Sequence, residues 1–159
     1  MSYHIYTTKS LVLSAKARGE ADRVYSILTR DLGLVRAVGL AVRKENSKLR
    51  GGLEPVSLSI ISLVRGKEYW RLTSAEFIKK VKKSKALAIL EKLVAGETPH
   101  PELFDAVEEF LSKPGFDNET QFVATILSHL GYLKKSDLNL DKKNLIKAIN
   151  EGLKQSHLV

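Results

Sequence analysis

Apolar residues in the first 77 positions fall in short runs that alternate with polar residues and show no helical period. Runs of this kind, separated by polar or glycine-containing segments, are typical of β-strands. We expect strands over Tyr3–Ala15, Arg23–Thr29, Leu34–Val42, Leu53–Val64 and Tyr69–Phe77. Five short strands without a crossover helix predict a closed or nearly closed barrel.

Turn and bulge signals within this half favour a curved sheet. Gly33 follows the second run and is placed for the positive φ of a hairpin turn. Gly39, inside the third run, indicates a bulge, a sharp bend or the close approach of another backbone. In the fourth run, alternate apolar positions over Val56–Ile60 give way to the opposite face over Ile61–Leu63. That slip of register predicts a bulge within the fourth strand.

After Phe77 the apolar residues take the spacing of amphipathic helices. Pro114-Gly115 is expected to stop the second of four helices, and Gly131 is expected to close the third at its C′ position. Each apolar stripe needs a covering partner, so the helices should pack as one small bundle. The residues expected to open the four helices are Ser84, Thr98-Pro99, Asp117 and Asp141.

Charge is distributed unevenly along the chain. Residues 1–86 carry 18 Lys and Arg against 7 Asp and Glu, whereas residues 87–159 carry 8 Lys against 11 Asp and Glu. All eight arginines lie between Arg18 and Arg71. Because arginine has a planar fork that pairs with phosphates and stacks on bases, this asymmetry predicts a polyanionic partner for the N-terminal half. A basic surface without a ligand is the alternative.

Catalytic and membrane functions have little support in the sequence. There is no cysteine, and His4, His100, His129 and His157 are scattered, so no metal site is expected. Gly51-Gly52 lacks the Lys-Ser/Thr of a phosphate-binding loop, and no Gly-x-Ser-x-Gly motif occurs. We therefore expect a protein that is not an enzyme and needs no cofactor. The absence of a long apolar stretch and of a signal-peptide pattern favours a cytoplasmic protein with no membrane partner.

Basic residues of the predicted barrel are the first candidates for binding a single nucleic-acid strand, which requires cations along the backbone and flat groups for the bases. Arg43-Lys44 and Lys48-Leu49-Arg50 share a polar connector that could close over a strand. Tyr25, Tyr69 and Trp70 are candidate stacking platforms, with the barrel core as the alternative location. Arg65 and Lys67 add to the basic set. The residues predicted to bind nucleic acid are Lys16, Arg18, Arg23, Tyr25, Arg30, Arg36, Arg43, Lys44, Lys48, Arg50 and Arg71.

Several short motifs, in this order and spacing, resemble the bacterial RecO family of DNA repair proteins. In the strand-rich half they are Gly19–Arg23 (GEADR), Leu28–Gly33 (LTRDLG), Arg36–Gly39 (RAVG) and Ser47–Pro55 (SKLRGGLEP). In the helical half they are Leu87–Leu93 (LAILEKL), Glu102–Phe104 (ELF) and Leu130–Tyr132 (LGY). The resemblance implies an N-terminal OB domain. The expected fold is thus α+β, with a five-stranded OB-type β-barrel in residues 1–80 and a small α-helical bundle in residues 81–159.

The resemblance also implies a function. Members of the family bind and anneal single-stranded DNA, work with RecR, and help the recombinase RecA replace single-strand-binding protein, whose tail docks on their helical domain. An RNA-binding OB module and a protein-interaction scaffold are the alternatives. Typical members carry a four-cysteine zinc motif soon after the Leu-Gly-Tyr segment, whereas here Lys134–Leu140 leads directly into the last helix. The chain looks like a short form of the family without the zinc module.

Overall fold

The computed structural model describes residues 3–94, 96–113 and 118–156. It forms two compact units. The first contains Met1–Lys82 together with Gly96–His100, and the second contains Lys83–Ala95 and Pro101–Val159. Nothing in the sequence pattern indicated that Gly96–His100, which lies between two helices, folds with the strands.

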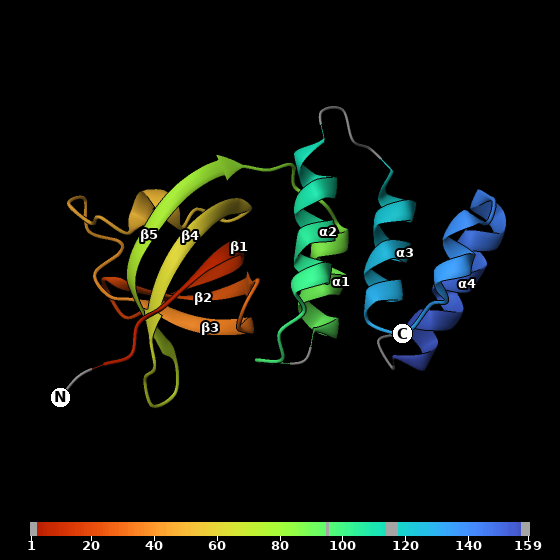
Figure 1. Cartoon of the computed structure of the whole chain (residues 1–159). Coiled ribbons are helices and arrows are strands. Elements are labelled where there is room, and N and C mark those ends of the chain that lie inside the picture. The colour runs from red at the N-terminus through yellow and green to blue at the C-terminus, as the bar shows by residue number, and fades with distance from the viewer. Residues whose placement is uncertain (1–2, 95, 114–117, 157–159) are drawn as a thin grey trace. The chain divides into compact units, whose positions relative to one another are not determined.

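The first unit is a closed barrel whose strands follow the order β1-β2-β3-β5-β4 (Figure 1). β1 is antiparallel to both β2 and β4, and a short parallel pairing of β3 with β5 completes the closure. This Greek-key arrangement of five strands is the OB architecture, as predicted. The strands are β1 (Tyr6–Arg18), β2 (Asp22–Thr29), β3 (Gly33–Gly39), β4 (Ser57–Val64) and β5 (Trp70–Lys80).

Bulges let long strands serve both sides of the barrel. The β1–β2 register shifts between Val12 and Ser14, and two further shifts occur where β4 pairs with β5. In the second pairing the extra residues are Thr73 and Ile78, so the bulges lie in β5. Each bulge bends its strand and increases the local twist, which closure requires.

The predicted slip of register within the fourth strand is wrong. β4 alternates regularly, with Ile61 and Leu63 in the barrel core and Ile60 37% exposed on the outer face. The misreading arises because two inward positions are serines. Ser57 and Ser59 donate their hydroxyl hydrogens to the backbone carbonyls of Glu54 and Gly52, so polar side chains are accommodated inside.

The third strand is shorter than predicted and ends at Gly39 rather than Val42. The chain turns at Ala41, whose φ is +55° and whose N–H donates to the Asp22 carboxylate at 2.6 Å. A Cβ atom on Gly39 would lie 3.2 Å from the Tyr25 ring, so the close neighbour is a side chain and not another backbone. Gly33 has the positive φ that the turn requires, as expected.

The segment Gly96–His100 extends the edge of β3 beyond its short pairing with β5. The Leu34 N–H donates to the Gly96 carbonyl at 2.9 Å. The Glu97 carboxylate accepts from the Trp70 indole N–H at 2.6 Å and from Arg65 at 3.3 Å. These contacts fasten the segment to the barrel core through Trp70, the only tryptophan of the chain.

The second unit contains the four predicted helices, and α3 contacts each of the other three. The buried side chains of this unit include the cluster Ala124, Leu127, Leu133, Leu145 and Ile149, of which Leu133 lies after α3. None of the helices in the described ranges is long and apolar enough to cross a membrane. The helices are α1 (Ala86–Leu93), α2 (Pro101–Ser112), α3 (Glu119–His129) and α4 (Lys142–Gln155).

The helix ends follow the predicted signals in part. The N-cap residue of α1 is Lys85 rather than Ser84, although the Ser84 hydroxyl accepts from the Ala86 N–H at 3.1 Å. The second helix begins at Pro101 rather than directly after Thr98-Pro99. Gly131 follows α3 with a φ of +85°, as expected. The side chain that caps α3 is Asn118, which accepts from the Gln121 N–H. Asp141 occupies the N-cap position of α4, but its carboxylate makes no capping bond to the backbone and accepts from the Asn144 side chain instead. The predicted signals Pro114-Gly115 and Asp117 lie outside the described residues.

Candidate nucleic-acid interface

Outward-facing side chains of β1, β2, β3 and β5 form one surface on the barrel. Tyr25 and Ile27 of β2 and Val35 and Ala37 of β3 lie in the core, so their neighbours along the strands face outward. The register then places Lys16, Val24, Val38 and Arg71 in one row across the four strands. We call this surface the basic face and define it by Lys16, Arg18, Val24, Ser26, Arg36, Val38, Tyr69 and Arg71.

The row has a cation at each end and two valines between them. Lys16 and Arg71 are exposed, Val24 is half-buried and Val38 is buried. Neighbouring strands are about 4.8 Å apart, so the path from Lys16 to Arg71 along the curved sheet is roughly 14 Å, three strand spacings. The row therefore joins two exposed cationic groups across two valines.

A tyrosine ring lies between two arginines on the basic face. The Arg18 and Arg36 guanidinium carbons are 5.3 Å and 5.9 Å from the centre of the Tyr69 ring. These residues come from β1, from β3 and from the position just before β5. Cation–π attraction orients both guanidinium groups and keeps the half-buried ring at the surface. The cluster thus combines the flat group and the cations that a single strand needs.

The other two aromatic candidates, Tyr25 and Trp70, lie in the barrel core and not on the basic face. Tyr25 is 2% exposed and Trp70 is 3% exposed, and both belong to the barrel core. Neither ring has an open face, so the proposed stacking role of Tyr25 and Trp70 is wrong. The physical reason is strand alternation: Tyr25 shares a face of β2 with Arg23, and that face points inward. Tyr69 and Arg71, on either side of Trp70, point outward together.

Three predicted arginines gather at the mouth of the barrel, away from the basic face. Arg23, Arg43 and Arg50 line a pocket of about 290 Å³ beneath the connector between β3 and β4. The connector is docked rather than open, because Arg43 donates its backbone N–H to Ala21 and a guanidinium hydrogen to Gly19. Burial raises the pKa of the Tyr25 hydroxyl, which also lines this pocket, and the Arg23 charge opposes that shift.

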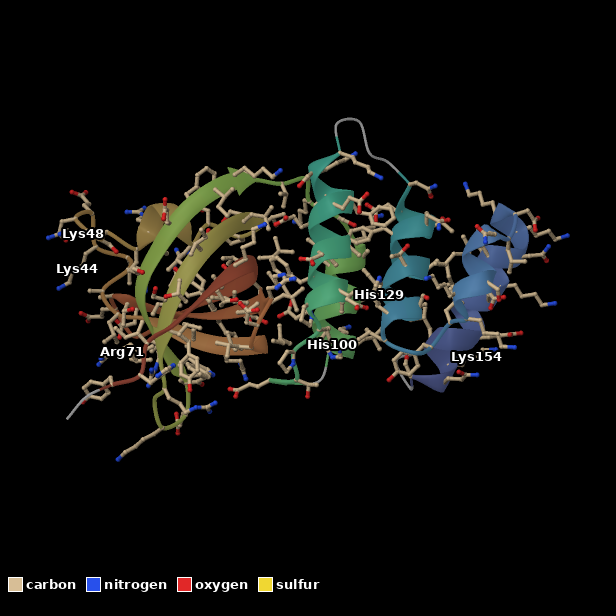
Figure 2. All side chains as sticks on the ribbon, in the orientation of Figure 1. Lys44, Lys48, Arg71, His100, His129 and Lys154 are labelled. Atoms are coloured by element: carbon tan, nitrogen blue, oxygen red, sulfur yellow. The ribbon has the colours of Figure 1, made fainter. Side chains whose placement is uncertain are left out.

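The remaining predicted cations lie outside these two groups. Lys44 and Lys48 project from the connector into solvent (Figure 2). Arg30 sits in the turn at the opposite end of β2 from Arg23, where its guanidinium pairs with Asp31 at 3.6 Å. Arg65 stacks over Trp70 at 4.4 Å and pairs with Glu97, so it serves the packing of the barrel. The nucleic-acid contacts of all these residues stay predictions.

No group of three or more His, Asp or Glu residues within the described ranges could hold a metal ion. His100 belongs to the segment docked on the barrel and His129 ends α3 (Figure 2). His157 lies outside the described residues.

The N-terminal half matches a known family. Residues 1–81 match the family described as "Recombination protein O N terminal". The chain is 43% identical to the DNA repair protein RecO of Dehalococcoides mccartyi over 75 residues, which cover 47% of this chain and 30% of that protein. It is 32% identical to the DNA repair protein RecO of Trichodesmium erythraeum over 120 residues, which cover 69% of this chain and 42% of that protein. The matched part thus spans less than half the length of these relatives.

Proposed function

Because this chain belongs to the recombination protein O family, we propose that it is a DNA repair protein whose barrel binds single-stranded DNA. The observation that carries the proposal is the basic face. In OB barrels the surface of strands 2 and 3, with the loops after strands 1 and 4, is the usual oligonucleotide site. Arg18 ends β1 and Tyr69 ends the loop after β4, so the Tyr69 cluster lies on that surface.

The basic face binds the strand through its backbone and its stacking surfaces. Lys16, Arg36 and Arg71 neutralise phosphates, and a base stacks on Tyr69 or on the guanidinium planes beside it. The half-buried Val24 supports the apolar sides of sugars and bases. None of these contacts reads the hydrogen-bonding edge of a base, so the proposed binding tolerates any sequence.

Strand annealing could use the same contacts. A strand held by its phosphates keeps its base edges free to pair, and the cations beneath it lessen repulsion from a second strand. We propose that the protein anneals complementary strands in this way. As a mediator it would work with RecR to load recombinase on strands coated by single-strand-binding protein.

An apolar groove on the second unit supports the proposed contact with the tail of single-strand-binding protein. The groove has a volume of about 250 Å³ and lies among α1, α3 and α4. Ile89, Val123 and Ile146 contribute to its lining, and Ile146 is exposed. Lys85 and Glu119 also line the groove; Glu119 accepts from the Ser84 hydroxyl at 2.6 Å, and Lys85 can pair with a carboxylate of a bound peptide. A short peptide with apolar side chains and a negative charge fits this site.

The test is the binding of a fluorescently labelled poly-dT oligonucleotide across a series of salt concentrations. In a plot of the logarithm of the binding constant against the logarithm of the salt concentration, each phosphate neutralised on a single strand contributes roughly 0.7 to the steepness of the negative slope. The double substitution Arg36→Gln/Arg71→Gln should weaken binding and reduce the slope by about 1.4, two such contacts. The control Lys142→Gln/Lys143→Gln removes the same charge from α4 and should leave the slope unchanged.

Equal slopes for both double variants would contradict binding on the basic face. Salt-independent, weak binding by the unaltered protein would contradict the nucleic-acid function and favour the scaffold alternative. Tighter binding of poly-U than of poly-dT would favour the RNA alternative.

A further inference from the structure

The pocket at the barrel mouth is a second site, separate from the basic face. It is lined by Arg23, Tyr25, Val42, Arg43, Arg50, Leu53 and Glu54. Arg23 and Tyr25 occupy inward positions of β2, whereas Val24 and Ser26 between and beyond them face outward. We call this site the mouth pocket. Its lining differs entirely from that of the basic face.

Positive charge in the mouth pocket exceeds negative charge. Three arginines and one acidic residue, Glu54, contribute to its lining. Within the described residues, Arg23 and Arg50 form no ion pair, and Arg43 uses one N–H on the Gly19 carbonyl. Each guanidinium carries five N–H donors, so most of their donors are available to a ligand. The excess of donors and charge favours an anionic ligand.

The Tyr25 hydroxyl supports the same conclusion independently. The side chain is 2% exposed and lines the pocket, yet no described residue accepts or donates a hydrogen bond at its hydroxyl. Among the described residues, the hydroxyl oxygen enclosed without a partner is that of Ser112, so the Tyr25 oxygen keeps access to the pocket, where its hydroxyl can donate to a ligand or to water. Burial raises the pKa of this hydroxyl, so at neutral pH it remains a hydrogen-bond donor.

The surrounding backbone holds the pocket in shape. The connector crosses the mouth with Ala41 in a left-handed conformation that the Asp22 carboxylate secures. Val42 and Leu53, on either arm of the connector, are buried in the barrel core. The volume of about 290 Å³ is at the lower end of the range for small-molecule sites, which suits one nucleotide rather than a longer stretch.

We propose that the mouth pocket binds a phosphate monoester, supplied by the terminal phosphate of a nucleic-acid strand. A monoester carries close to two negative charges and three free oxygens at neutral pH. It matches three guanidinium groups and a tyrosine donor better than an internal phosphodiester does, since a diester has one charge and continues on both sides. The proposal deepens the proposed function, because it assigns the end of a strand to one site and the body of the strand to the basic face.

The experiment compares internally labelled oligo-dT strands that carry a 5′-phosphate, a 3′-phosphate or neither. One of the two phosphorylated strands should bind the full chain about tenfold more tightly than the unphosphorylated strand, as one charged hydrogen-bond contact provides. Tyr25→Phe and Arg50→Gln should each bring this ratio close to one. Lys79→Gln, which removes a charge from β5 outside both sites, should leave the ratio unchanged.

Calorimetry with inorganic phosphate, thymidine monophosphate and thymidine separates the sources of the phosphate. Binding of the monophosphate, but not of thymidine, supports the proposal. Inorganic phosphate that binds as tightly as the monophosphate would overturn the assignment to a strand end. Equal affinity of all three strands, with no binding of the monophosphate, would overturn the proposal and leave strand binding on the basic face intact. If the protein binds the monophosphate but none of the three strands, the proposed function is refuted and the phosphate site in the mouth pocket is not.

Discussion

Gly33 is the position where a single methyl group tests how closely the Gly96–His100 segment packs on the barrel. Its φ is +76°, and a Cβ atom there would lie 2.5 Å from the carbonyl oxygen of Thr98. Gly19 has a φ of +60° in the turn between β1 and β2, but a Cβ atom there would meet nothing within 4 Å. The two glycines therefore separate the cost of a left-handed backbone from the cost of a clash.

Gly19→Ala should lower the free energy of unfolding by about 1–2 kcal/mol, the cost of placing an L-residue in a left-handed conformation. Gly33→Ala carries the same cost and adds about 1–3 kcal/mol of overpacking. The added cost is unavoidable because the clash is with backbone atoms, which cannot rotate away as a side chain can. We expect a total of roughly 2–5 kcal/mol for Gly33→Ala.

Urea unfolding followed by tryptophan fluorescence measures both variants. Trp70 is the single tryptophan and is buried in the barrel core, so its emission reports on the first unit. With a urea dependence of about 1–3 kcal/mol per molar, the Gly33→Ala midpoint should lie roughly 1 M below that of Gly19→Ala. Equal midpoints would refute the packing of Thr98 against Gly33.

Three further predictions concern single side chains. Tyr69→Ala should weaken poly-dT binding by about 1–3 kcal/mol in an anisotropy titration, and an abasic strand, which has nothing to stack, should lose little. Because burial raises the pKa of the Tyr25 hydroxyl, the folded barrel holds the hydroxyl proton more tightly than the unfolded chain does. The stability that comes from keeping Tyr25 protonated is therefore lost as the pH rises above 10.0. Urea titrations on either side of that pH should show a smaller decline for Tyr25→Phe, and an identical decline would contradict the burial. Asn118→Ala removes the cap of α3 and should cost about 1 kcal/mol by circular dichroism, whereas an unchanged melting temperature would argue against the cap.

Local periodicity predicted the number and kind of the elements because alternation and helical spacing are properties of a few consecutive residues. It failed where burial depends on distant partners. Ser57 and Ser59 face the barrel interior because backbone carbonyls of Glu54 and Gly52 accept their hydroxyl hydrogens. No feature of β4 alone indicates those acceptors, so the apolar pattern was assigned the wrong phase.

The basic set could be predicted from composition, but its division into two sites could not. Register decides that Lys16 and Arg71 share a row with two valines. Strand alternation near the start of β2 places Arg23 in the lining of the mouth pocket. Counts of charged residues reveal neither arrangement. Alternation places Tyr69 and Arg71 on one face, whereas the docking of Glu97 on Trp70 has no signal in the local sequence.

Mapping of backbone amide NMR shifts during titration with an unphosphorylated oligo-dT tests the central claim most directly. If the basic face binds the strand, the largest shifts will follow the row of Lys16, Val24, Val38 and Arg71 and the neighbouring Tyr69. Shifts confined to α1–α4, with this row unchanged at saturation, would contradict strand binding by the barrel.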